Sequence, residues 1–260
     1  MTSPKVITTT KNAIQIVTIS RPAVRNAVDN ETAEALAAAF RAFDTDPTLR
    51  VAIFTGAGSH FCAGADLNEM ASGARRKRWR ESTDGPMGPT RLSLSKPVIG
   101  AIEGYAVAGG LELALWCDLR VAADNSVFGV FNRRWGVPLM DGGTVRLPRL
   151  VGVGRALEIA LTGRPVHAEE ALRIGLVTEL TPPSAALQRA IELAETLAAL
   201  PQDALNLDRK SIYRQVGLSL EEAMEAEFRD SLAARGVESG AARFVQGAGR
   251  HGNSDTGQSD

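Results

Sequence analysis

The pattern of hydrophobic and polar positions divides the chain into an alternating part and a purely helical part. Val6–Thr10 and Ile14–Ser20 are β-branched runs of alternating polarity, separated by three residues, and they predict a β-hairpin. Further strands are predicted at 51–55, 97–103, 119–123, 127–130 and 176–180. Helices are predicted from Asp29 or Asn30 to Phe43, from Asp66 onward, and at 109–117, 155–162 and 168–174.

After Pro182-Pro183 only helical patterns follow, at 185–199, 202–216 and 220–235. The alternation of strands and helices predicts an α/β core domain over residues 1–182, and the helical patterns predict a C-terminal subdomain over 183–246. The tail at 247–260 is made of small and polar residues, which predicts disorder.

Two loops rich in small residues stand out, at 61–66 and 104–112. Each follows a predicted strand and opens a predicted helix. Because helix N-termini present N–H groups without an intrahelical acceptor, two such loops converging on one point would form an oxyanion hole from backbone alone. A second interpretation stays open, in which both loops are tight turns that contain glycine for close packing.

Glu112 is the only charged residue between Gly104 and Cys117, and it lies in the first turn of an otherwise apolar helix. A buried carboxylate must be paired, hydrogen-bonded or protonated with a raised pKa. Beside a small-residue loop, such a group is a candidate general acid or base. The alternative is a glutamate that binds nearby backbone N–H groups or reaches solvent.

The segment between residues 72 and 89 is rich in Arg, Gly and Pro and predicts a mobile stretch of surface. Its basic residues are Arg75, Arg76, Lys77, Arg78 and Arg80. A solvated face is the simpler interpretation of this cluster. Attraction for the phosphates of a nucleotide-like ligand is the alternative.

Composition narrows the functional classes. The chain has 260 residues, 44% of them hydrophobic, and a net charge of −1, so no overall field favours nucleic acid or an anionic membrane. Cys62 and Cys117 are too few for a disulfide framework or a metal site. No apolar run approaches the roughly 20 residues needed to span a bilayer. A cytoplasmic protein is therefore expected.

Taken together, the motifs resemble the crotonase superfamily, which includes enoyl-CoA hydratases and isomerases. The resemblance runs in order from about Ile14 to Phe244 and combines the two loops with several shorter matches. These are Arg21-Pro22, Asn26-Ala27, Lys96–Ala101, Cys117-Asp118, Gly142-Gly143-Thr144, Arg146-Leu147, Leu161-Thr162-Gly163 and Ala168–Val177.

The resemblance implies a spiral of stacked ββα units with a helical C-terminal region, assembled as a trimer or a dimer of trimers. It implies an acyl-CoA substrate, with no cofactor beyond the coenzyme A that the substrate carries. By the same resemblance, the N–H groups of Ala65 and Gly109 hold the thioester oxygen and Glu112 is the first catalytic glutamate. The CoA channel is then lined by Val24, Arg25, Ala27, Ala63, Asp66 and Leu67.

The chain departs from the hydratase pattern at the second catalytic glutamate. Counting without a gap from Glu112, that position is Asn132, which cannot transfer a proton as a carboxylic acid does but can orient water. Asp141 is a carboxylate near the place where some relatives of the superfamily carry a catalytic aspartate. It is either the acid/base partner of Glu112 or a turn aspartate, and pairing with Arg133 or Arg134 would lower its pKa.

The resemblance implies hydration of a 2-enoyl-CoA as the first expectation, with Glu112 activating water and Asp141 or a water held by Asn132 replacing the second acid. The same enolate chemistry also fits an isomerase, lyase, racemase or decarboxylase that acts on an acyl-CoA. A non-catalytic acyl-CoA-binding protein is the alternative of another class.

Overall fold

The computed structural model describes residues 3–73, 75 and 83–247. The chain forms two compact units, Met1–Ala194 and Glu195–Asp260. Apart from Gly247, the tail predicted to be disordered lies outside the described residues, as do four of the five basic residues of the Arg-rich segment. The domain boundary predicted after residue 182 stays a prediction, since compactness alone does not define a domain.

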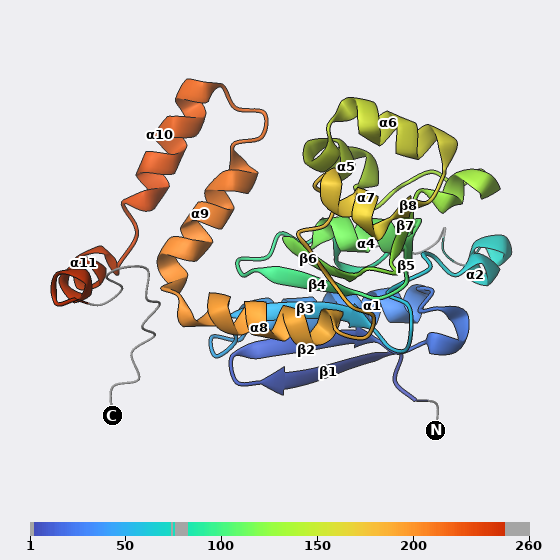
Figure 1. Cartoon of the computed structure of the whole chain (residues 1–260), viewed down its shortest axis with the longest axis horizontal. Helices are drawn as coiled ribbons and strands as arrows, with labels where there is room; N and C mark the ends of the chain where they lie inside the picture. The colour runs from blue at the N-terminus through green and yellow to red at the C-terminus, as the bar shows by residue number, and fades with distance from the viewer. Residues whose placement is uncertain (1–2, 74, 76–82, 248–260) are drawn as a thin grey trace. The chain divides into compact units, whose positions relative to one another are not determined.

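The first unit is built on a six-stranded sheet (Figure 1). Its strands, in spatial order, are β1 (Val6–Lys11), β2 (Ile14–Ile19), β3 (Val51–Gly56), β4 (Val98–Ile102), β6 (Leu119–Ala123) and β9 (Glu179–Thr181). The first two strands form the predicted antiparallel hairpin, and all later pairs are parallel. Strands β3 and β4 are buried along nearly their whole length, as parallel strands covered on both faces are.

A smaller sheet lies beside the first. It contains β5 (Tyr105–Val107), β7 (Val127–Gly129) and β8 (Val166–His167). Two isolated parallel bridges, Val28–Ala65 and Cys62–Ala106, continue the same ladder toward the N-terminal part of the chain. These short segments bring together loops that lie about 40 residues apart in the sequence.

The two sheets reveal a repeated unit. Each repeat places one segment in the large sheet, the next in the small ladder, and then starts a helix. The helices that follow the ladder segments are α1 (Asn30–Thr45), α2 (Leu67–Ser72), α4 (Gly109–Trp116) and α5 (Gly143–Val151). The α/β class and the stacked ββα arrangement are thus confirmed. One consequence is that the N-termini of α2 and α4 lie next to each other, because their ladder segments are bridged.

The core behind these helix starts is held by aromatic side chains. Phe40 contacts Phe54 and Trp116 edge-to-face, with ring centroids 5.2 and 4.8 Å apart, and Phe54 contacts Phe61 in the same way. Edge-to-face pairs add to the area that the rings bury. Phe61 directly precedes the first small-residue loop, so this cluster anchors that loop to the sheet.

Among the described residues, the first unit also contains α6 (Val153–Thr162), α7 (Ala168–Arg173) and α8 (Ala186–Ala199). The last residues of α8 fall in the second unit. The second unit continues with α9 (Gln202–Arg214), α10 (Leu220–Ser231) and α11 (Val237–Val245). Helices α5 and α11 were not predicted; Gly143 and Pro148 in α5 disfavour a helix on propensity alone. In the described part of the chain, no helix combines the length and apolar character needed to cross a bilayer.

Candidate active site

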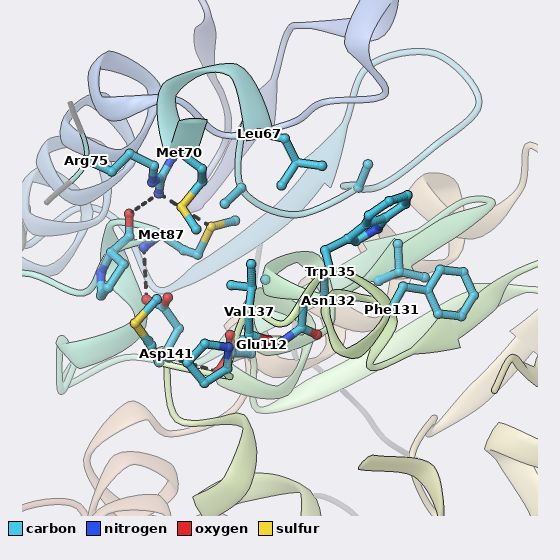
Figure 2. A pocket seen from close by; sticks show the side chains of 18 of the residues that line it. Leu67, Met70, Arg75, Met87, Glu112, Phe131, Asn132, Trp135, Val137 and Asp141 are labelled. Carbon is cyan, nitrogen blue, oxygen red and sulfur yellow. Dashed lines mark hydrogen bonds between the residues drawn. The ribbon is translucent and has the colours of Figure 1, made fainter. Parts of the chain in front are cut away.

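A pocket of about 230 Å³ opens at the paired helix starts (Figure 2). Its wall comes from the two small-residue loops, the segment before β4, and the turn between β7 and α5. Chemically distinctive residues on this wall are Ala65, Gly109, Glu112, Asn132 and Asp141. The pocket therefore collects all three predicted catalytic side chains and both predicted oxyanion-hole residues.

Two backbone N–H groups of the loops, those of Ala65 and Gly109, donate to no backbone carbonyl among the described residues. In the ladder, the N–H of Val28 donates to the carbonyl of Gly64 at 2.8 Å, and the N–H of Asp66 donates to the carbonyl of Val28 at 2.9 Å. Because successive N–H groups alternate in direction along an extended segment, the N–H of Ala65 faces the other side. Gly109 is the first residue of α4, so its N–H has no acceptor within the helix. A Cβ on Gly64 would lie 3.1 Å from the nitrogen of Gly109, which shows how closely the two loops approach.

Ala108, just before Gly109, has a backbone conformation that alanine rarely adopts. Its φ is 54° and its ψ is −125°. The ψ angle of Ala108 sets the direction of the Gly109 N–H. A residue held in such a region costs on the order of 1–3 kcal/mol and persists only where the surrounding structure imposes it. The backbone strain thus lies at the residue that sets the direction of the Gly109 N–H.

Glu112 lies on the first turn of α4 and is 3% exposed. Its Oε1 accepts hydrogen bonds from the backbone N–H groups of Asp141 and Gly143, both at 2.8 Å. Burial and the negative charge of Asp141 raise the pKa of Glu112 to about 7. A carboxyl group with that pKa is poised to gain or lose a proton near neutral pH.

Asp141 is also buried, and its side chain faces the pocket beside Glu112 (Figure 2). Its Oδ1 accepts hydrogen bonds from the N–H of Met87 at 2.9 Å and from the hydroxyl of Thr90. Burial raises the pKa of Asp141 above its ordinary value, while these two hydrogen bonds oppose the rise. The turn-aspartate interpretation is wrong for the side chain, because the carboxylate binds a segment more than 50 residues away.

Neither arginine expected as a possible partner reaches Asp141. Arg133 and Arg134 direct their guanidinium groups to the carbonyls of Ala160 and Gly163. Asp141 and Glu112 thus form a pair of buried carboxyl groups whose environments both favour the protonated form. In such a pair one group can hold a proton while the other is ionised.

Asn132 is 9% exposed and belongs to the pocket wall. Its amide nitrogen donates to the carbonyl of Val137 at 2.7 Å, which fixes the orientation of the side chain. Its Oδ1 is buried and accepts no hydrogen bond from any residue in the described ranges. A buried acceptor of this kind calls for a donor from water or from a ligand.

The predicted CoA-channel residues fall into two groups. Arg25, Ala63 and Leu67 line the pocket, whereas Val24, Ala27 and Asp66 do not. The side chain of Asp66 caps α2 by accepting a hydrogen bond from the N–H of Asn68. The guanidinium group of Arg21 donates to Asp66 at 3.2 Å and also to the Ala27 carbonyl. Asp66 and Ala27 therefore brace the loops that carry the first group.

Arg75 and residues 85–89 of the Arg-rich segment are buried, so the prediction of a mobile stretch of surface is wrong for these residues. Arg75 is 1% exposed and donates to the carbonyls of Val28 and Pro86, so it is not part of a solvated face. Met87 is buried, and residues 85–90 pack over Asp141 rather than forming a mobile surface. Sequence reasoning missed Met87 and Thr90; the one available signal was an apolar methionine inside a Gly/Pro-rich stretch.

Other reactive side chains stay outside the chemistry. Burial raises the pKa of the Cys62 thiol to about 12, which rules out a thiolate nucleophile at neutral pH. His60 contacts Tyr105 and is not among the pocket residues. Among the described residues, no group of His, Cys, Asp or Glu is arranged to hold a metal ion.

Comparisons with known proteins agree with this geometry. Residues 9–246 match the family described as enoyl-CoA hydratase/isomerase. The chain is 39% identical over 191 residues to enoyl-CoA hydratase EchA19 of Mycobacterium tuberculosis, covering 71% of each protein. It is 34% identical over 224 residues to the 2,3-dehydroadipyl-CoA hydratase of Escherichia coli, covering 86% of this chain and 87% of that protein.

The fold is also similar to a solved structure. The crystal structure of enoyl-CoA hydratase EchA1 from Mycobacterium marinum superimposes with a TM-score of 0.86 and 37% sequence identity. The similarity covers 94% of this chain and 96% of that chain.

Proposed function

The chain belongs to the enoyl-CoA hydratase/isomerase family, and on that basis we propose that it hydrates a 2-enoyl-CoA to a 3-hydroxyacyl-CoA. The observation that carries the proposal is the buried Glu112–Asp141 pair, set beside two backbone N–H groups in one pocket. One relative's name specifies a 2,3-dehydroadipyl group and the other's only an enoyl group, so the proposal covers the reaction and not the acyl chain.

The N–H groups of Ala65 and Gly109 form the oxyanion hole in this proposal. Adding water across a double bond conjugated to a thioester builds negative charge on the thioester oxygen. Fixed donors stabilise that charge most strongly in the transition state, since they need no reorganisation when it forms. The strained peptide after Ala108 supports the assignment, because it holds one donor in a fixed direction.

Glu112 in its ionised form takes a proton from water, whose oxygen bonds to the β-carbon of the enoyl group. The α-carbon then receives a proton from Asp141, or from a water held by Asn132, and the thioester is restored. Asn132 takes the position of the family's second glutamate. Its buried Oδ1 supports a role in orienting water, since the amide has no proton to transfer as an acid.

Coenzyme A enters as part of the substrate. We propose that Arg25, Ala63 and Leu67 line its channel, with Val24, Ala27 and Asp66 shaping the loop around it. Proton transfer beside a thioester requires no redox group and no metal. We further propose a cytoplasmic homotrimer or dimer of trimers. The exposed apolar side chains of Val153, Leu157 and Leu161 on α6 support burial against another subunit.

Isomerisation of an enoyl-CoA is the second candidate, and Asn132 is the observation that favours it. A single pair of carboxyl groups can move a proton between two carbons of an acyl-CoA without activating water. The two reactions share the oxyanion hole and Glu112, so the substrate and not the geometry separates them.

The test is the absorbance of crotonoyl-CoA and of a longer 2-enoyl-CoA, measured with wild type beside Glu112→Gln. We expect fast loss of the conjugated thioester band, reduced on the order of a hundredfold or more in the variant. If wild type binds CoA thioesters but leaves the band unchanged, hydration is wrong. A 3-enoyl-CoA that gains the band under the same conditions would then establish the isomerase.

A further inference from the structure

Thr90 lies next to the catalytic pair without lining the pocket, and the reaction proposed above gives it no role. We propose that Thr90 is a positioning residue that holds Asp141 so that the exchangeable proton of this carboxyl group is bound on Oδ2. The inference rests on the proposed function only in taking Asp141 as the partner of Glu112.

The hydrogen bonds to Asp141 carry the inference. The hydroxyl of Thr90 and the N–H of Met87 both donate to Oδ1, and Oδ2 accepts no hydrogen bond within the described segments. An oxygen that already accepts two hydrogen bonds is a poor site for a proton. A proton on Asp141 is therefore bound at Oδ2, the oxygen left for exchange with a bound molecule.

The sequence places Thr90 through a compact turn. Gly88 has a φ of 98° and donates to the carbonyl of Gly85 at 2.8 Å, and the short 3-10 helix Pro89–Arg91 follows. A Cβ on Gly85 would lie 1.9 Å from Oγ1 of Thr90 and 2.8 Å from Oδ1 of Asp141. Only glycine at position 85 lets this turn approach the carboxylate, so the contact is built into the local sequence.

Arg146 fixes the same contact from α5. Its guanidinium group donates to the carbonyl of Thr90 at 2.7 Å and to the carbonyl of Asp141 at 2.9 Å. The backbones of Thr90 and Asp141 are thus held by one planar, rigid group. Both backbones are fixed and Thr90 is 1% exposed, so its hydroxyl donates to the carboxylate without competition from bulk water.

The position of the hydroxyl also sets the acid strength of Asp141. The ionisable groups that face Asp141 are Glu112, whose pKa the charge of Asp141 raises, and the cations Arg75, Arg91 and Arg146. Burial favours the protonated form of Asp141, and the Thr90 hydroxyl stabilises the ionised form. Without that hydroxyl Asp141 would hold its proton more tightly and would be a weaker acid at neutral pH.

The first experiment compares Thr90→Val, which keeps the shape and removes the hydroxyl, with Thr90→Ser, which keeps the hydroxyl. The carboxyl carbon of Asp141 is followed by ¹³C NMR in a Glu112→Gln background, so that one group titrates, and it is assigned through Asp141→Asn. We expect Thr90→Val to raise the midpoint by about one pH unit, a tenfold change in proton affinity, and Thr90→Ser to restore it. Thr90→Ala replaces the valine variant if that variant fails to fold.

The second experiment is the pH dependence of kcat/KM for a 2-enoyl-CoA with Glu112 intact. Thr90→Val should move the alkaline limb to higher pH and lower the plateau, and Thr90→Ser should behave as wild type. Thr181→Val is the matched control, because it removes a buried hydroxyl that contacts the carbonyl of Ala122 outside the pocket. It should leave the profile unchanged.

The outcomes separate the two proposals. An unmoved NMR midpoint in folded Thr90→Val, or a serine variant that fails to restore it, overturns the role of Thr90 even if the wild type hydrates its substrate. A shifted midpoint in a protein that hydrates nothing supports the role of Thr90 and overturns the proposed function instead.

Discussion

The backbone N–H of Asp141 donates to Oε1 of Glu112 at 2.8 Å, so one member of the carboxyl pair holds the other in place. The hydrogen bond fixes Glu112 without involving the side chain of Asp141, which remains available to the pocket. It also brings two acidic groups close together in a region shielded from water, where like charges disfavour double ionisation. The proton affinity of each carboxyl group therefore depends on how close this hydrogen bond holds the two groups.

The first prediction concerns stability and pH. The pKa of Glu112 rises from an ordinary 4.5 to about 7 in the folded chain, so folding takes up a proton between these values. The stabilising contribution of this group is full below pH 4.5 and is lost as the pH rises through 7, a loss on the order of 3 kcal/mol. Glu112→Gln does not titrate but keeps an acceptor for both N–H donors.

Urea unfolding of both proteins at pH 4.5, 6 and 7.5 checks this. The difference in free energy of unfolding should change steadily in favour of Glu112→Gln as the pH rises. Parallel pH profiles for the two proteins would contradict a raised pKa at this residue.

The second prediction concerns the space around Glu112. A Cβ on Gly143 would lie 2.9 Å from Cδ1 of Leu139 and 3.0 Å from Oε1 of Glu112. We expect Gly143→Ala to destabilise the fold by about 1–3 kcal/mol and to reduce kcat by more than the stability loss explains. Gly154 is the matched control, since a Cβ there contacts nothing within 4 Å; in α6, Gly154→Ala should stabilise by up to about 1 kcal/mol. Thermal unfolding and initial rates measure both.

The third prediction concerns the strained peptide. Ala108→Gly relieves a conformation that costs on the order of 1–3 kcal/mol, offset by the greater freedom of glycine in the unfolded chain. We expect a stability gain of about 1 kcal/mol together with a lower kcat, because the direction of the Gly109 N–H is less fixed. Ala106→Gly, in the adjoining strand β5, should instead destabilise. If both variants lose stability alike, Ala108 carries no strain.

The fourth prediction concerns Asn132. Replacing it by leucine removes a buried oxygen that no described residue satisfies, but it also removes the hydrogen bond to the Val137 carbonyl, so we expect a stability loss of about 1 kcal/mol. Hydration should still fall by roughly tenfold or more, as expected when a group that positions the reacting water is lost. Asn206 has a similarly unsatisfied buried oxygen on α9, and Asn206→Leu should leave the rate unchanged. Equal rates for wild type and Asn132→Leu would remove Asn132 from the reaction.

Glu112 could be found from the sequence because a single carboxylate in an apolar helix has few explanations. The same applies to the small-residue loops, whose glycines and position after strands predict helix starts that approach each other. The ladder bridges at Ala65 and Ala106 then realise that approach in the structure. The local sequence pattern was therefore sufficient to predict features that a single helix or loop determines.

The environment of Asp141 could not be found in this way. Its carboxylate binds Met87 and Thr90, which are 54 and 51 residues away in the sequence, and nothing in the local pattern around any of the three predicts the contact. Arg75 shows the same limit. Composition favours solvent for an arginine in a polar run, but the carbonyls of Val28 and Pro86 satisfy its guanidinium group inside the fold.

Helix α4 has a consequence for how this protein can change in length. Gly109 and Glu112 lie three residues apart on one turn, about 4.5 Å along the helix axis. One inserted residue between them would rotate the Glu112 carboxyl by about 100° away from Asp141. Insertions in surface loops leave this spacing untouched, whereas a single residue gained or lost within 110–111 would change the position of the Glu112 carboxyl relative to the Gly109 N–H.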